Sequence, residues 1–140
     1  MPVPTAIISD IHSNVEALRA VLADIDRRGI ERIICLGDII GYGPNPLECL
    51  DLVEERCEWS LMGNHDFGVL YEPTNFNAPA AAAAYWTRDQ LDAEPDDEKR
   101  ARRYDFLGRL RVRVVETAPD GTVPRSEERR VGKECVRLCR

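Results

Sequence analysis

Histidine is scarce in this 140-residue chain, which has only two, His12 and His65. Long apolar runs are absent too, since none approaches the roughly 20 residues that a membrane-spanning helix needs. The N-terminus also lacks the basic-then-apolar pattern of a signal peptide. These absences predict a cytoplasmic protein with no membrane partner.

The chain has no excess of positive charge, and its formal net charge is -6. We therefore expect no specific binding of nucleic acid, because phosphate backbones attract clustered Lys and Arg. A phosphorylated small molecule stays open as a partner, since a bound metal can outweigh the negative field locally. With 44% hydrophobic residues, the chain can bury one core, which predicts one domain or part of one.

The five cysteines show no paired metal-ligand spacing, and an odd number argues against a disulfide framework. We expect the first three, Cys35, Cys49 and Cys57, to be small buried hydrophobic residues.

Three short apolar runs predict the strands of a parallel sheet. They are residues 5–9, 32–36 and 59–62, and segments with helical spacing separate them. Ser13 and Glu16 read as a capping box that opens the first helix, and Asn45 as the cap of the second. Further helices are expected at 77–91 and 96–110, and a strand at 112–116. Because right-handed crossovers align such strands, the pattern predicts an α/β fold with its polar turns at one edge.

Each predicted strand runs into a polar turn. Asp10 and His12 follow the first, Asp38 the second, and Asn64 and His65 the third, with 28 residues from Asp10 to Asp38 and 26 from Asp38 to Asn64. Singly, such residues are often helix caps or left-handed turns. Together they offer oxygen and nitrogen ligands that suit Mn, Fe, Zn or Mg. Asp38 is placed to bridge two metal ions, with His65 near enough to protonate a leaving oxygen.

Residues 9–14, 36–44 and 62–66 resemble the first three motifs of the calcineurin-like metallophosphoesterases. Their sequences are similar to those of the small bacterial and archaeal phosphodiesterase-like branch. The resemblance implies an αββα sandwich and hydrolysis of phosphate esters by a metal-bound hydroxide at a dinuclear centre. It also implies that Asp10 and His12 hold one metal, that Asp38 bridges, that Asn64 holds the second, and that His65 is catalytic.

The chain departs from this family after His65, where it has no further histidine. The family completes both metals with histidines from two later motifs. Residues 125–140 also resemble the translation of a sequencing adapter. We therefore interpret residues 1–124 as the N-terminal part of a truncated metallophosphoesterase domain, residues 125–140 as a non-native tail, and the fragment as inactive.

Two other functions stay open. Some relatives of this fold are non-catalytic interaction scaffolds, although intact early motifs favour an enzyme. Among enzymes, the alternatives are a protein phosphatase and a dinucleotide polyphosphate hydrolase, besides a phosphodiesterase. Tyr42, Tyr85 and Trp86 are interpreted as packing residues, since nothing in the sequence favours a substrate-stacking role.

Overall fold

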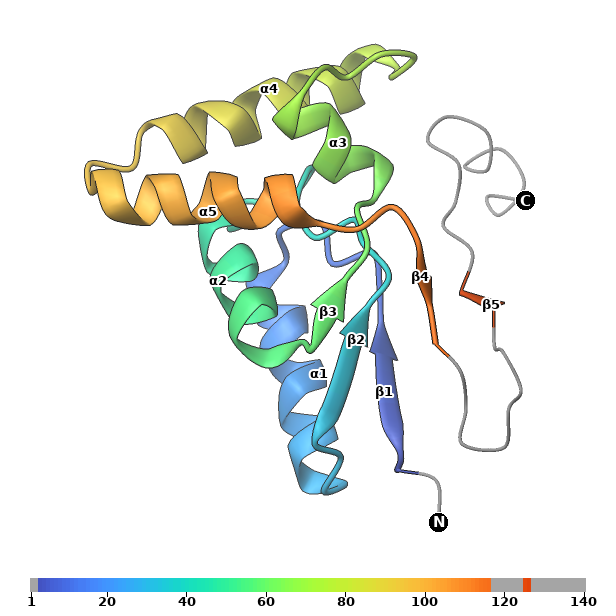
Figure 1. The fold of residues 1–140 in the computed structure, drawn as a ribbon. Coiled ribbons are helices and arrows are strands. Elements are labelled where there is room, and N and C mark those ends of the chain that lie inside the picture. The colour runs from blue at the N-terminus through green and yellow to red at the C-terminus, as the bar shows by residue number, and fades with distance from the viewer. Residues whose placement is uncertain (1–2, 117–124, 127–140) are drawn as a thin grey trace.

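The computed structural model describes residues 3–116 and 125–126, and three parallel strands form its centre (Figure 1). The strands lie in the order β1 (Thr5–Ile8), β2 (Arg32–Cys35) and β3 (Trp59–Ser60). β1 pairs with β2 from Thr5 opposite Arg32 to Ile8 opposite Cys35, and Ile34 lies opposite Trp59 in β3. The predicted parallel arrangement is confirmed.

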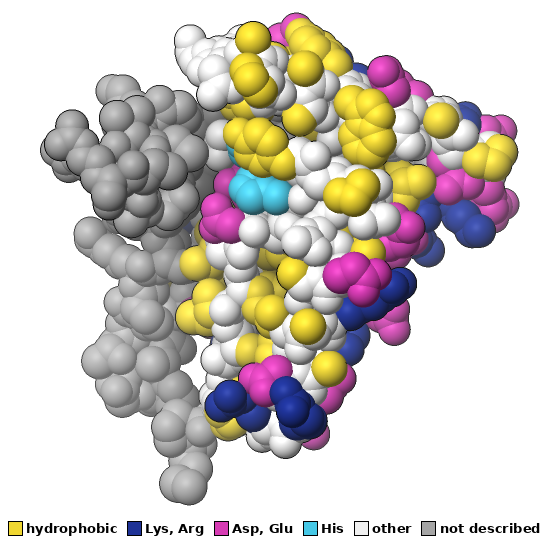
Figure 2. Space-filling model, turned by 180° about the vertical axis from the view of Figure 1, so that it is seen from behind, with side chains coloured by type: hydrophobic (Ala, Val, Ile, Leu, Met, Phe, Trp, Pro, Cys, Tyr) yellow, Lys and Arg dark blue, Asp and Glu magenta, His cyan; other side chains and the backbone are white. Residues whose placement is uncertain are grey.

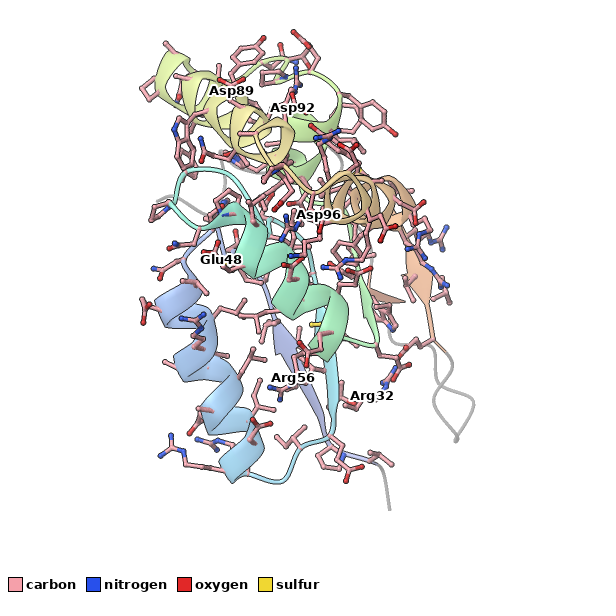
Figure 3. The ribbon with its side chains drawn as sticks, turned by 90° about the vertical axis from the view of Figure 1, so that its left-hand side faces the viewer. Arg32, Glu48, Arg56, Asp89, Asp92 and Asp96 are labelled. Atoms are coloured by element: carbon pink, nitrogen blue, oxygen red, sulfur yellow. The ribbon has the colours of Figure 1, made fainter. Side chains whose placement is uncertain are left out.

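Two crossover helices, α1 (Val15–Arg27) and α2 (Pro46–Arg56), cover one face of this sheet (Figure 1). Their buried residues pack against the inner side chains of the strands. The main members of this core are Leu18, Leu22, Ile25, Ile33, Cys35, Cys49, Leu50 and Val53. Figure 3 shows Arg56 on the side of α2 that faces α1, where it pairs with Asp26.

Three further helices lie beyond the carboxyl ends of the strands: α3 (Asn64–Leu70), α4 (Ala78–Asp92) and α5 (Asp97–Arg109) (Figure 1). The two longer ones begin near the positions that the sequence predicts. Asn77 caps α4 by accepting from the Ala80 N–H, and Asp96 caps α5. No helix in the described part of the chain has the length and apolar character to cross a bilayer.

The predicted capping box at the start of α1 is wrong. The cap is Asn14, whose side-chain oxygen accepts from the Ala17 N–H at 3.0 Å. Ser13 is bound to other loops instead, because its N–H donates to the Ile39 carbonyl and its own carbonyl accepts from Asn45. These contacts hold Ser13 outside the helix. At α2, Asn45 has the predicted cap position but its side chain makes no capping hydrogen bond.

The cysteine prediction is confirmed for Cys35 and Cys49, which are fully buried, whereas Cys57 is only partly buried. Burial raises the pKa of the Cys35 thiol to about 11 and that of Cys49 to about 12. Both therefore stay protonated and unreactive near neutral pH.

The sheet face opposite α1 and α2 carries exposed apolar side chains. Ile7 of β1 is 62% exposed, although its neighbours Ala6 and Ile8 pack on the core.

The predicted strand at 112–116 shortens to β4 (Val114–Val115), which pairs antiparallel with β5 (Arg125–Ser126). Among the described residues, one helix layer thus covers one sheet, as in the N-terminal half of an αββα sandwich. The division at residue 124 stays a prediction, since most of the tail lies outside the described ranges.

A partly buried ion-pair group joins α5 to α2. Arg103, whose side chain is 7% exposed, donates to Asp51 at 2.7 and 2.9 Å and to Glu94 at 2.6 Å. Burial opposes ionisation of Asp51, but hydrogen bonds from Arg103 and Arg102 keep the pKa of Asp51 below its ordinary value.

We expect Asp51→Asn to lower the free energy of unfolding by about 2 kcal/mol at pH 7, because it removes a charge-assisted pair. Since a lowered pKa stabilises only above the pKa of the unfolded chain, the deficit should shrink as the pH falls below about 4. Urea unfolding at pH 7 and pH 3 measures both values. Asp89→Asn, at an exposed position on α4 (Figure 3), is the control and should change stability by less than about 0.5 kcal/mol. A deficit that grows in acid would contradict this interpretation.

Candidate metal centre

The turns after β1 and β2 bring three of the four predicted metal ligands together. One ligand atom each from Asp10, His12 and Asp38 lies within 4.8 Å of the other two. Asp10 is exposed, His12 is partly exposed and Asp38 is 8% exposed, so the cluster opens to the surface. Figure 2 shows histidine surface beside acidic side chains, with hydrophobic side chains adjoining it.

Backbone hydrogen bonds continue from β1 and β2 into these turns. Asp10 N–H donates to the backbone carbonyl of Gly37 at 3.1 Å, and His12 N–H donates to the backbone carbonyl of Asp38 at 3.0 Å. The backbone is left-handed at all three ligands, with φ of 56° at Asp10, 47° at His12 and 54° at Asp38. Such conformations cost about 1–3 kcal/mol each and gather at functional sites. The pairing of the turns holds the ligands in a conformation that they would not adopt alone.

Asp66, to which the sequence pattern assigns no separate role, is fully buried and joins the second turn to the third. Its carboxylate accepts four backbone N–H groups, from Gly63, Asp38, Ile39 and Ile40, at 2.8–3.1 Å. Each oxygen accepts two of them, which fits the ionised form. Burial and then the charge of Asp38 raise the pKa of Asp66 to about 7, while the N–H groups act against this. An acid at the third position of a helix is a known capping signal that could have indicated part of this role.

The surroundings of the His12 ring suit a metal ligand. Its Nδ1 lies 3.3 Å from the Ile40 carbonyl oxygen, and its Nε2 lies 3.9 Å from Asp10 Oδ1. If Nδ1 carries the proton and donates to that carbonyl, Nε2 presents its lone pair to the carboxylates. A hydrogen bond from the other ring nitrogen to a backbone carbonyl, as from Nδ1 to Ile40, is the usual support of a ligating imidazole. The three residues therefore fit a divalent cation.

His65, the predicted catalytic residue, lies in the first turn of α3 and is 5% exposed. Its backbone N–H donates to Asp38 Oδ1 at 2.9 Å, and its ring centroid lies 4.8 Å from that of His12. Burial lowers the pKa of His65, although Asp38 acts in the opposite direction. The imidazole is therefore mainly neutral near pH 7. Its Nδ1 is buried with no partner among the described residues.

Asn64, the fourth predicted ligand, is the first residue of α3 and is half-buried. Its two neighbours both lie against Asp38, because a Cβ on Gly63 would overlap the Asp38 carboxylate. Residues 63–66 thus open a helix rather than form an isolated turn. The role of Asn64 at a second metal stays a prediction.

The three aromatic side chains predicted to pack, Tyr42, Tyr85 and Trp86, are only partly covered. Tyr42 is 54% exposed, Tyr85 44% and Trp86 41%, so a large part of each side chain faces solvent.

Comparison with known proteins agrees with this architecture. The pattern of the calcineurin-like phosphoesterase family matches residues 3–121. An uncharacterized protein of Methanocaldococcus jannaschii is 53% identical over 91 residues, which are 64% of this chain and 37% of that protein.

Two solved structures are also similar. A metallophosphoesterase from Sphaerobacter thermophilus superposes with a TM-score of 0.63 at 40% identity, covering 81% of this chain and 43% of that one. A protein described as a candidate diadenosine tetraphosphatase gives a TM-score of 0.53 at 20% identity over 76% of this chain and 42% of that one, which supports the fold alone. The chain spans less than half the length of each relative. From the matched residues and the arrangement of its three motifs, it belongs to the calcineurin-like phosphoesterase family.

Proposed function

We propose that this chain carries the first half of a divalent-metal site for the hydrolysis of phosphate esters. The observation that supports this most directly is the cluster of Asp10, His12 and Asp38 within 4.8 Å at the carboxyl edge of a parallel sheet. Open α/β sheets bind their ligands at that edge. The substrate class that fits is a phosphorylated small molecule or a phosphodiester, and we place the protein in the cytoplasm.

In this proposal two cations would share Asp38. Asp10 and His12 would hold one of them, and Asn64, at the start of α3, would hold the other. Bound cations, for which we propose manganese first, would neutralise phosphoryl oxygens and activate water. His65 then has one remaining task. As a mainly neutral imidazole it would donate a hydrogen bond to the leaving oxygen and so stabilise the charge that develops there.

Four protein ligands leave two cations incompletely held, so we propose that this chain alone turns over little substrate. The chain has no histidine after His65 that could add a ligand. Octahedral ions need about six ligands each, and water would have to fill the remaining positions. Weak metal affinity follows from that shortage.

The test compares this chain with the Sphaerobacter protein to which it is 40% identical. Calorimetry with Mn²⁺ measures metal binding, and bis(p-nitrophenyl) phosphate and p-nitrophenyl phosphate measure turnover of diesters and monoesters. We expect metal-linked heat in both proteins, and turnover at least about 100-fold lower in this chain. Loss of a group that only hydrogen-bonds to a metal ligand already costs about 10–100-fold in metal affinity or activity, and the loss of a ligand should cost more.

Two outcomes would contradict the proposal separately. Equal turnover would overturn the claim of an incomplete site. No metal-linked heat in this chain at millimolar Mn²⁺ would overturn the metal site itself and favour a non-catalytic scaffold.

A further inference from the structure

Tyr42 lies over the two histidines of the candidate metal centre. Its ring centroid is 4.5 Å from that of His65 and 5.2 Å from that of His12. Phe76 contacts His65 as well, at 4.8 Å. Tyr42 is nevertheless 54% exposed, and its hydroxyl has no hydrogen-bond partner among the described residues. An open aromatic ring therefore borders the cluster of candidate ligands.

The backbone at Tyr42 is left-handed, with φ of 59°. This conformation is unusual for a bulky residue and costs about 1–3 kcal/mol. In the described part of the chain, six residues other than glycine have positive φ, and three of them are the candidate ligands Asp10, His12 and Asp38. Tyr42 thus shares an uncommon conformation with the metal site.

The glycines on either side of Tyr42 let the loop press against both histidines. A Cβ on Gly41 would lie 2.8 Å from Nδ1 of His65, and one on Gly43 would overlap the His12 carbonyl. This close approach fixes where the intervening residue lies. Because more than half of that residue stays exposed, filling the core does not explain a tyrosine here.

We propose that Tyr42 contacts the organic group of the substrate and makes the site prefer phosphate esters of planar aromatic groups. This inference rests on the proposed function. A phosphoryl group bound to a cation at Asp10, His12 and Asp38 would place its ester group near the exposed Tyr42 ring, whose centroid is 5.2 Å from that of His12. Stacking on an aromatic side chain is favourable for any base or aryl ring, so a nucleoside and a phenyl group share the chemistry that Tyr42 recognises.

A purely structural role for Tyr42 gives different expectations. If the ring only supported the histidines, its loss would weaken binding of every phosphate compound equally and destabilise the fold. If the ring contacts substrate, Tyr42→Asn should leave the melting temperature unchanged or raise it, because asparagine tolerates left-handed backbone. Tyr42→Gly is a second variant that suits the same conformation.

The experiment is calorimetry of the 140-residue chain in saturating Mn²⁺ with four probes: inorganic phosphate, glycerol phosphate, phenyl phosphate and adenosine monophosphate. We expect the wild type to bind one or both aromatic esters about tenfold more tightly than glycerol phosphate, within the range of base-on-aromatic stacking. Tyr42→Asn and Tyr42→Gly should lose this preference and bind inorganic phosphate within about twofold of the wild type. Tyr42→Phe should keep it, and Tyr71→Asn, at a tyrosine that is 55% exposed at the end of α3, is the matched control.

The outcomes separate the two proposals. A wild type that binds phosphate but shows no aromatic preference, or a preference that survives Tyr42→Asn, overturns the role of Tyr42 and leaves the metal site standing. Loss of the preference in Tyr42→Phe overturns the role of the ring. If Mn²⁺ binds but no phosphate compound does, the proposed function fails and the role of Tyr42 fails with it.

Discussion

Replacing Asp66 with alanine is expected to lower the free energy of unfolding by at least about 4 kcal/mol, since it strands four N–H donors, three buried and one partly buried, at roughly 1–3 kcal/mol each. Those donors come from two separate loops, at residues 38–40 and at Gly63. Without the carboxylate the loops separate or admit water. The turns after β2 and β3 then keep only weaker links, such as the hydrogen bond from His65 N–H to Asp38.

Asp66→Asn separates the loss of volume from the loss of acceptors. Its oxygen still accepts two N–H groups, but its NH₂ faces the other two, so about half of the loss is expected. Urea unfolding measures both variants without metal. The control is again Asp89→Asn, which should change stability by less than about 0.5 kcal/mol. If Asp66→Ala were as mild as that control, Asp66 would not join the turns.

Asp38→Asn is expected to lower Mn²⁺ affinity at least about 100-fold, because the variant loses a charged ligand at the centre of the cluster. The stability of the metal-free protein, in contrast, should not fall in this variant. Asp38 repels the buried Asp66 and helps to raise its pKa. The asparagine oxygen can still accept from His65 N–H, as Asp38 Oδ1 does at 2.9 Å. The metal-free variant should therefore be as stable as the wild type or more stable.

Thermal melting with and without Mn²⁺ measures both effects of Asp38→Asn. The wild type should gain melting temperature as Mn²⁺ is added, because a ligand that binds only the folded state stabilises it. The variant should show no such gain, whereas Asp89→Asn should respond as the wild type does. A variant that loses metal-free stability and keeps its response to Mn²⁺ would assign Asp38 a structural role only.

The parallel sheet and the convergence of Asp10, His12 and Asp38 follow from sequence spacing. Strand, helix and return occupy a nearly constant length, and the handedness of crossovers then fixes which edge the turns share. The expected starts of the helices at 77 and 96 also agree with the caps at Asn77 and Asp96, because a helix start depends on residues within one helical turn.

The roles of Ser13, Asp66 and Tyr42 depend on contacts between loops that are far apart in the chain. Ser13 is bound to Ile39, and Asp66 to residues 38–40, across separations of 26 to 28 residues. No local pattern specifies such pairings. The sequence likewise does not show that Tyr42 stays exposed, because the approach of its loop depends on glycines packing against two histidines.

The shared cation site is tested most directly by anomalous X-ray diffraction from crystals of this chain grown with Mn²⁺. We expect a manganese peak coordinated by Asp10, His12 and Asp38, with oxygen and nitrogen distances near 2.2 Å, roughly those of other divalent ions. A second peak on the Asn64 side of Asp38 would support a bridged pair. Crystals with manganese bound elsewhere, and none at these three residues, would contradict the account.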